Sequence, residues 1–236
     1  ARNGLYPAPQ CAGCASTAIP SEVEERTLRD QAGGEEERFL RTVRVHDEPP
    51  LDEYLADLMT RLLIAAADAP TVRVTVLRDA APNAFALPNG RLFVHTGLLA
   101  RLDNEAQLAA ILGREAVHLT GRHALRAGRE APDAASPSGS SLLVSQGLPL
   151  TYTAAVTGYG RDLEREADTE GLARMVRAGY DPREAPRAFE RLRGESGGPI
   201  RLEGFYLGNR ARLDARLAGT REWLLANSAD ASFEAL

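Results

Sequence analysis

The sequence predicts an α+β fold that is mostly helical, with a small β-sheet in the middle of the chain. Apolar residues recur at helical spacing on both sides of a central region, before residue 68 and after residue 104. In that central region the segment TVRVTVLRD alternates apolar and polar residues, which is typical of a strand. The sequence Pro88-Asn89-Gly90 lies between two apolar runs and predicts a turn, and therefore a hairpin. Helices arranged around one small sheet define the α+β class.

Length and composition indicate a soluble, globular chain. Its 236 residues are enough for one large domain, and 44% of them are hydrophobic while 26% are charged. The formal net charge is -5 and no segment is strongly basic, so we expect no nucleic-acid partner. The longest apolar runs, such as LLIAAA, are too short to cross a bilayer, so we expect no transmembrane segment in this chain.

The first 34 residues predict an irregular arm followed by a short helix. Residues 1–20 are rich in Pro, Gly, Ala and Ser. Ser21 and Glu24 have the spacing of a capping box, and Gly33-Gly34 is expected to break the helix that they begin. The chain starts with Ala and shows no signal-like segment, which predicts a processed or trimmed form. The expected parts are the arm with its helix (1–34), a main domain (35–226) and a C-terminal tail (227–236).

Cys11 and Cys14 form a C-x-x-C pair in this arm. A local disulfide in an oxidising compartment is the favoured interpretation. Haem attachment would require His at the next position, which is Ala15, and a structural zinc site would require a second pair of ligands. Two free thiols without a function are the alternative.

Six helices complete the predicted main domain. Each has apolar residues at helical spacing, and proline or glycine marks where helices end. Pro49-Pro50 separates the first helix from the second, and Gly179 ends the fourth. In chain order we expect helices at residues 35–44, 51–67 and 104–126, then a small-residue loop at 131–141, an apolar stretch at 142–156, and helices at 161–178, 183–193 and 210–226.

The helix at 104–126 carries a pattern close to that of a zinc peptidase. Its segment AAILGREAVHLTGRHALR places Arg114 and His118 four residues apart, on one helix face. Two His at that spacing bind zinc, and a Glu between them activates water. Here Glu115 and His118 are in place and Arg114 replaces the first His. Taken alone, the pattern favours an exposed, salt-bridged helix. His123 would lie ~140° further around one continuous helix, which predicts a packing role.

Two longer segments resemble one zinc metallopeptidase family. They are NAFALPNGRLFVHTGLLARLDNEAQLAAILGREAVHLTGRHALR and YGRDLEREADTEGLARMVRAGYDP. Both are similar to the family that groups the CAAX prenyl protease with mitochondrial Oma-type proteases and bacterial periplasmic quality-control proteases. The family pattern leads through TGLL into His-Glu-x-x-His and continues with Glu-x-x-x-Asp on a later helix. The resemblance covers residues 35–220 and implies a gluzincin-like metallopeptidase fold with a hairpin beside the active-site helix.

The resemblance implies a role for each matching position. In the family, three residues bind zinc, one acts as general base, and further residues lie next to these and hold them in position. The two positions in LGNRARLDARL follow from a looser alignment with a family segment near the end of the domain. The matching residues are Arg114, His118 and Glu164 at the ligand positions, Glu115 at the base, and Asp168, Arg210 and Arg216 as supporting residues.

Arg114 changes the chemistry that these positions can support. Its guanidinium stays protonated and has no lone pair for a metal, so only His118 and Glu164 of the usual three ligands would remain. We therefore expect no cofactor, although zinc serves the active family, and we expect Glu115 to be idle as a base. Without a metal the two glutamates would repel, and we expect Arg114 to bridge them, with Arg210 as a second cation if it points inward. The alternative is an empty site with Arg114 in solvent.

The strand after the predicted turn, at residues 90–97, is expected to bind extended peptides. In the family that the chain resembles, this strand lies beside the cleft and pairs with peptide as an added strand. The residues that would do so here are Gly90, Arg91, Leu92, Phe93 and Val94.

Three functions remain open from the sequence. The first is a catalytically inactive pseudopeptidase that binds a protein or peptide, or serves as an accessory subunit of a cell-envelope complex. The second is an active zinc-dependent metalloendopeptidase with an altered ligand set, and the third is a purely structural domain. The resemblance and the cysteine pair predict a bacterial protein outside the cytoplasm, periplasmic or secreted, and associated with a membrane through its partners.

Overall fold

The computed structural model describes residues 22–64, 71–130, 159–194 and 210–227. Within these ranges the chain is mostly helical and contains one small mixed sheet, so the predicted α+β class is confirmed. The elements are α1 (Glu22–Leu40), α2 (Pro49–Leu63), β1 (Arg73–Leu77), β2 (Ala84–Ala86), β3 (Arg91–His95), α3 (Thr96–Leu99), α4 (Glu105–Thr120), α5 (His123–Glu130), α8 (Arg161–Arg177), α9 (Glu184–Gly194) and α10 (Arg210–Asn227).

Four of the predicted helices match described helices closely. They correspond to α2, α8, α9 and α10, whose ends differ from the predicted ones by a few residues. Proline is accepted in the first turn of a helix, which lets α2 begin at Pro49. Gly179 has a φ of 86° just beyond the end of α8, a conformation that favours glycine. None of the described helices is both long and apolar enough to cross a bilayer.

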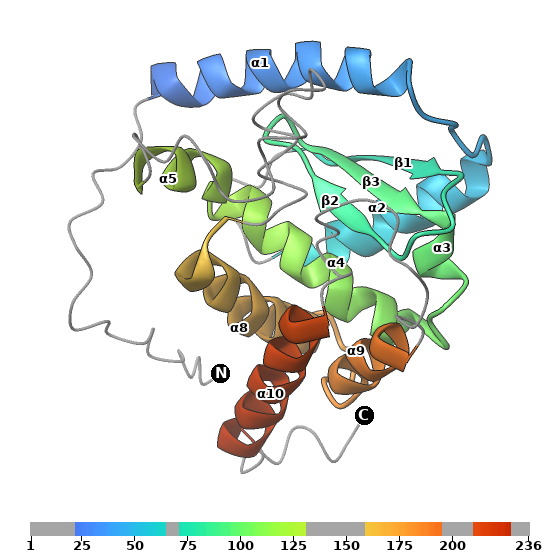
Figure 1. Cartoon of the computed structure of the whole chain (residues 1–236), viewed down its shortest axis with the longest axis vertical. Helices are drawn as coiled ribbons and strands as arrows, with labels where there is room; N and C mark the ends of the chain where they lie inside the picture. Colours follow the sequence, from blue (N-terminus) through green and yellow to red (C-terminus); the bar gives the residue numbers. More distant parts are fainter. Residues whose placement is uncertain (1–21, 65–70, 131–158, 195–209, 228–236) are drawn as a thin grey trace, which may run out of the picture.

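The sheet has the order β1-β3-β2. β1 runs parallel to β3, and β2 pairs with β3 in antiparallel orientation, which confirms the predicted hairpin. Gly90 makes the turn with a φ of 83°, and the N–H of Leu87 donates to the carbonyl oxygen of Arg91 at 2.8 Å. In Figure 1, α1 lies along one side of the sheet, whereas α8, α9 and α10 lie on the other side beyond α4.

The core has one part on each face of the sheet. On one face, Val76 and Leu92 pack with Leu58 of α2 and Leu112 of α4 in the larger cluster of buried side chains. On the other face, aromatic rings pack edge to face, with the ring centroid of Phe39 from α1 5.1 Å from that of Phe93. Since both faces are covered, the sheet is a fixed support for the helices around it.

The predicted break at Gly33-Gly34 is wrong, because α1 runs through both glycines without interruption. Neither glycine has a positive φ. The part of α1 after them is anchored to the hairpin: Arg91 Nε donates to Glu36 Oε1 at 2.6 Å, and Phe39 is buried. These tertiary contacts offset the low helix propensity of the two glycines. The domain boundary predicted after residue 34 therefore falls inside α1.

The predicted single helix at 104–126 is also wrong, because the chain turns at residues 121 and 122. α4 ends at Thr120, Arg122 has a φ of 52°, and α5 starts at His123. A side chain on Gly121 would place its Cβ 2.6 Å from His123 Nε2, so the fold requires glycine there. The turn brings the ring of His123 back against the end of α4.

α4 and α8 pack closely enough for their backbones to touch. A Cβ added to Gly113 would lie 2.9 Å from the carbonyl oxygen of Gly171, and one added to Gly171 would lie 3.0 Å from Arg114 N. Real Cβ atoms do not tolerate the first distance and rarely the second. The glycine pair therefore sets the spacing of the two helices at the level of Arg114.

We expect Gly113→Ala to lower the free energy of unfolding by about 1–3 kcal/mol, because the added methyl group meets backbone that cannot move aside. Urea denaturation followed by circular dichroism measures this change. Gly219→Ala is the matched control, since a Cβ at that position in α10 has no neighbour within 4 Å. The control should be neutral or stabilising because alanine favours a helix over glycine. Equal effects of the two substitutions would contradict the close packing.

Candidate functional site

The residues predicted to form a site meet where α4, α8 and α10 converge, around the side chain of Arg114. This side chain is only 3% exposed. Its Nε donates to Asp168 Oδ1 at 2.5 Å, and its Nη2 donates to Glu164 Oε2 in a short contact. Its Nη1 lies 3.4 Å from Glu115 Oε1, a longer and weaker contact. Arg114 thus lies between the two glutamates, as the bridging hypothesis expects, and Asp168 is a further partner.

α8 presents its two carboxylates to Arg114 from one face. Glu164 and Asp168 are four residues apart, so their side chains lie one turn apart on the same side of the helix. Glu164 is also held from the chain before α8, because the backbone N–H of Tyr159 donates to its Oε1 at 2.9 Å. Both oxygens of the Glu164 carboxylate therefore accept hydrogen bonds within the protein.

A second arginine reaches the same carboxylates from α10. Arg216 is 5% exposed, and its Nη2 donates to Glu164 Oε2 at 3.1 Å. Its Nε lies 3.8 Å from Asp168 Oδ1. The second cation expected from the sequence is Arg210, whereas the structure shows Arg216 in contact with these carboxylates. Arg210 begins α10, but its side chain lies outside the described residues, as do Cys11 and Cys14.

Glu115 lies deep in the same cluster, with 3% of the residue exposed. Burial raises the pKa of its carboxyl group to about 7, even though the charge of Arg114 and a backbone hydrogen bond with Ala86 lower it. The neighbouring charge of Glu164 raises this pKa further. Glu164 and Asp168 pair with the two arginines, whereas Glu115 is the carboxyl group whose pKa burial raises.

His118 forms a buried pair with His123 instead of pointing into solvent. Their Nδ1 atoms are 2.8 Å apart and their ring centroids 4.8 Å apart. Burial, together with the charge of Arg114, holds the pKa of His118 well below its usual range, so its ring is neutral. His123 is buried, in line with its predicted packing role, but its predicted position is wrong: the turn at residues 121 and 122 brings it to His118, which a continuous helix would prevent. Gly121 is the sequence signal for this turn.

The sequence reasoning also missed Tyr159 and Glu166, which complete the surroundings of the histidine pair. The ring centroid of Tyr159 lies 4.7 Å from that of His118. Glu166 Oε1 lies 3.5 Å from His123 Nε2, and Arg126 holds the same carboxylate through two hydrogen bonds. No local sequence pattern predicts that Tyr159 and Glu166 meet the histidine pair, since the residues involved lie on α4, on α5 and at or just before the start of α8.

The residues at the three predicted ligand positions do not fit a zinc ion. Arg114 has no lone pair to offer, and its guanidinium lies against the carboxylate of Glu164. Glu164 uses both carboxylate oxygens in hydrogen bonds within the protein, so His118 is the one remaining ligand among the three positions. Across the described ranges no group of three His, Cys, Asp or Glu side chains could hold a metal ion.

The prediction that residues 90–97 pair with a peptide is wrong for residues 91–95, which form β3. β3 lies in the middle of the sheet, with β1 on one side along residues 91–95 and β2 on the other along residues 92–94. Its backbone groups are therefore already paired and cannot accept an added strand. On the side of α4, the outer strand of the described sheet is β2.

The pKa of Glu115 gives a pH-dependent stability that can be measured. The folded chain holds this proton to a pH of about 7, whereas the ordinary value is 4.5, so the contribution of Glu115 to stability falls as pH rises between these values. Glu115→Gln does not titrate, so we expect its stability relative to the natural chain to rise by about 3 kcal/mol from pH 4.5 to pH 7.5. Urea denaturation at several pH values tests this, and parallel stability curves would contradict it.

Comparison with known proteins places these residues in one family. The model of Peptidase family M48 matches residues 49–224, which include every described residue of the Arg114 cluster. A putative beta-barrel assembly-enhancing protease of Vibrio cholerae is 33% identical over 175 residues, 67% of this chain and 36% of that protein. The beta-barrel assembly-enhancing protease of Escherichia coli is 31% identical over 162 residues, 62% of this chain and 33% of that protein.

A eukaryotic relative has a similar sequence identity over a similar share of this chain. The mitochondrial metalloendopeptidase OMA1 of Schizosaccharomyces pombe is 30% identical over 154 residues, 63% of this chain and 46% of that protein. The chain matches only about a third to a half of the length of these relatives. Because the family model covers the sheet and every helix that carries the described site, the chain belongs to Peptidase family M48, a family of zinc metallopeptidases.

Proposed function

We propose that this M48 family member does not hydrolyse peptide bonds and acts instead as a binding or accessory subunit of a cell-envelope complex. The proposal is carried by one observation. Arg114 stands at the first ligand position of the family, and its guanidinium donates to Glu164 and Asp168. Positive charge is supplied there by a side chain that can neither bind nor activate water as a metal ion does.

The guanidinium replaces the charge of a metal ion without its chemistry. Peptide hydrolysis by this family depends on a water molecule activated by zinc, with a glutamate as base. Glu115 has the position of that base, but its carboxyl group faces Arg114 and the backbone of Ala86. It therefore acts as a buried structural group that fills the interior of the site.

The same network joins three helices. Arg114 from α4 and Arg216 from α10 share the carboxylates of α8, and all of these contacts are partly or fully buried. Removing one member would leave the others as uncompensated buried charges, which is costly. We infer that the network preserves the peptidase fold for another use.

A peptide could still pair with the described sheet, but along β2 and not along β3. β2 is the outer strand on the side of α4, and an extended peptide binds most readily at such an edge. The names of the bacterial relatives also guide the proposal. They describe enhancement of β-barrel assembly, and bacterial β-barrels are proteins of the outer membrane. We therefore propose a location outside the cytoplasm, with membrane association through partners.

Zinc content and proteolysis test the proposal directly. After incubation with zinc and removal of free metal, we expect the natural chain to retain almost no zinc and to leave casein uncut. Arg114→His restores the third ligand, so we expect it to retain about one zinc ion per chain. Arg114→Gln is the matched control, because it removes the positive charge without supplying an imidazole. Stoichiometric zinc together with casein cleavage by the natural chain would establish the alternative, an active peptidase with an altered ligand set.

Stability measurements test the structural role of the network. We expect Arg114→Met to lower the free energy of unfolding by about 3–5 kcal/mol, because it removes the more buried of the two cations and leaves Arg216 alone beside the carboxylates of α8. Arg191→Met is the control, since Arg191 pairs with Asp103 at the surface, where its side chain is 55% exposed. The control should cost less than about 1 kcal/mol. If the two substitutions had equal effects in urea denaturation, the buried network would not have the proposed role.

A further inference from the structure

α1 consists of two parts with very different attachment. In the part after Gly33-Gly34, Glu36 is buried and accepts hydrogen bonds from Arg91 Nε at 2.6 Å and Asn89 Nδ2 at 2.7 Å. Phe39 in the same part packs against the aromatic rings of the sheet. This second part is therefore anchored on the hairpin.

The first part of α1, residues 22–31, contains no buried residue. Its side chains are mostly exposed, and Val23 is 74% exposed. An ion pair attaches it to the end of α4: Glu25 Oε2 lies 3.1 Å from Arg122 Nη2. Leu28 lines the pocket beneath it. Such contacts hold a helix only weakly, because a partly exposed ion pair contributes little.

The two glycines between these parts are not required by packing or by backbone conformation. A Cβ at Gly33 would have no neighbour within 4 Å, and one at Gly34 would meet only the end of the Arg38 side chain at 3.9 Å. Both residues are helical, where alanine is strongly preferred over glycine. Their effect is to weaken the helix between its anchored part and its weakly held part.

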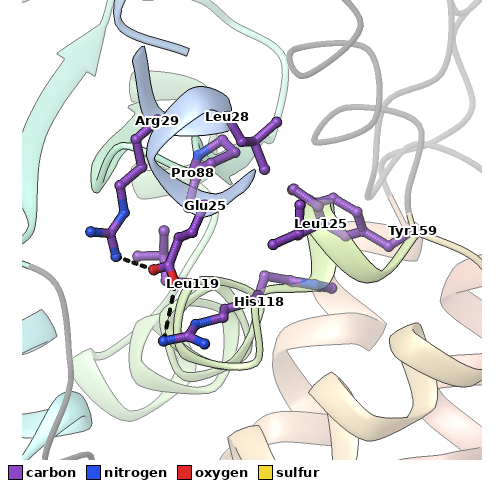
Figure 2. Close-up of a pocket in the computed structure, with 11 residues that line it drawn as sticks. Glu25, Leu28, Arg29, Pro88, His118, Leu119, Leu125 and Tyr159 are labelled. Carbon is purple, nitrogen blue, oxygen red and sulfur yellow. Dashed lines mark hydrogen bonds and ion pairs between the residues drawn. The ribbon is translucent and has the colours of Figure 1, made fainter. Parts of the chain in front are cut away.

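The weakly held part covers a pocket beside the histidine pair. Figure 2 shows Glu25, Leu28 and Arg29 of α1 on one side of this pocket and Pro88 from the hairpin turn beside them, with His118 below. Further lining comes from Ala86, Leu119, Arg122, Ala124, Leu125 and Tyr159. With α1 in place, the pocket has a volume of about 30 Å³, which is room for about two water molecules. Movement of this part of α1 would enlarge the pocket.

We propose that residues 22–31 form a lid, hinged at the segment from Ala32 to Gly34, that closes the pocket between β2 and the α4–α5 turn, while Ala32 stays buried in the cluster beside the aromatic rings of the sheet. Opening breaks the Glu25–Arg122 ion pair and withdraws Leu28, while the second part of α1 keeps its contacts with the hairpin. It widens the pocket beside Ala86, at the end of the outer strand of the described sheet. The ligand admitted would be an extended peptide, and this last step rests on the proposed function.

Hydrogen exchange of the full chain, followed by mass spectrometry, tests the hinge without any ligand. In the natural chain we expect the amides of residues 26–32 to exchange at least tenfold faster than those of residues 37–40. Glu25→Gln removes both the ion pair with Arg122 and the one with Arg29 inside α1, and should speed exchange at residues 26–32 about threefold. Gly33→Ala combined with Gly34→Ala should slow it roughly tenfold. Residues 37–40 should change little in either variant.

The matched control is Glu37→Gln, which removes the same charge from the anchored part of α1. Among the described residues Glu37 has no salt-bridge partner, so exchange at residues 26–32 should stay as in the natural chain. Equal exchange in both parts of α1, or variants that change both parts together, would overturn the hinge. In that case the helix would open as one unit.

Binding of fluorescein-labelled casein, measured by fluorescence anisotropy, tests what the lid admits. We expect Glu25→Gln to associate about threefold faster than the natural chain, and the double alanine variant to associate roughly tenfold slower. Unchanged association rates would overturn the gating role. If exchange responds as expected but no form binds casein, the lid stands and the peptide-binding part of the proposed function fails.

Discussion

A buried positive charge is the constraint on which the centre of this fold depends. The guanidinium of Arg114 is almost fully removed from water, and an isolated charge in such a place would be prohibitively unfavourable. Two carboxylates of α8, those of Glu164 and Asp168, lie one turn apart and accept hydrogen bonds from this guanidinium. Arg216 of α10 donates a further hydrogen bond to Glu164. The positions of three helices are therefore linked through one set of hydrogen-bonded charges.

Backbone packing and charge act together at this point. The contact of Gly113 with Gly171 brings α4 and α8 close enough for Arg114 to reach both carboxylates of α8. Because the two arginines are already balanced by these carboxylates, Glu115 carries little further benefit as an anion, and burial raises its pKa. His118 beyond it stays neutral, since burial and the neighbouring positive charge of Arg114 both oppose its protonation.

The parts of the fold and site that could be predicted follow from local signals. Helical spacing located α8, and the four-residue separation of Glu164 and Asp168 placed both on one face. The turn signal at Gly90 located the hairpin correctly. The failures involve contacts between distant segments. The anchoring of α1 on the hairpin kept it helical through Gly33-Gly34, and the turn after Gly121 brought His123 to His118.

The sequence alone determined the α+β class, the family resemblance that the comparisons confirmed, and the Arg-Glu-x-x-His pattern at residues 114–118. These depend on residue identity and on short-range spacing, which the chain carries directly. Only the tertiary structure decided that β3 lies in the middle of the sheet, that Asp168 is a main partner of Arg114, and that α1 covers the pocket beside His118. Strand order and the pairing of buried charges are set by contacts between residues far apart in sequence, and no local pattern specifies them.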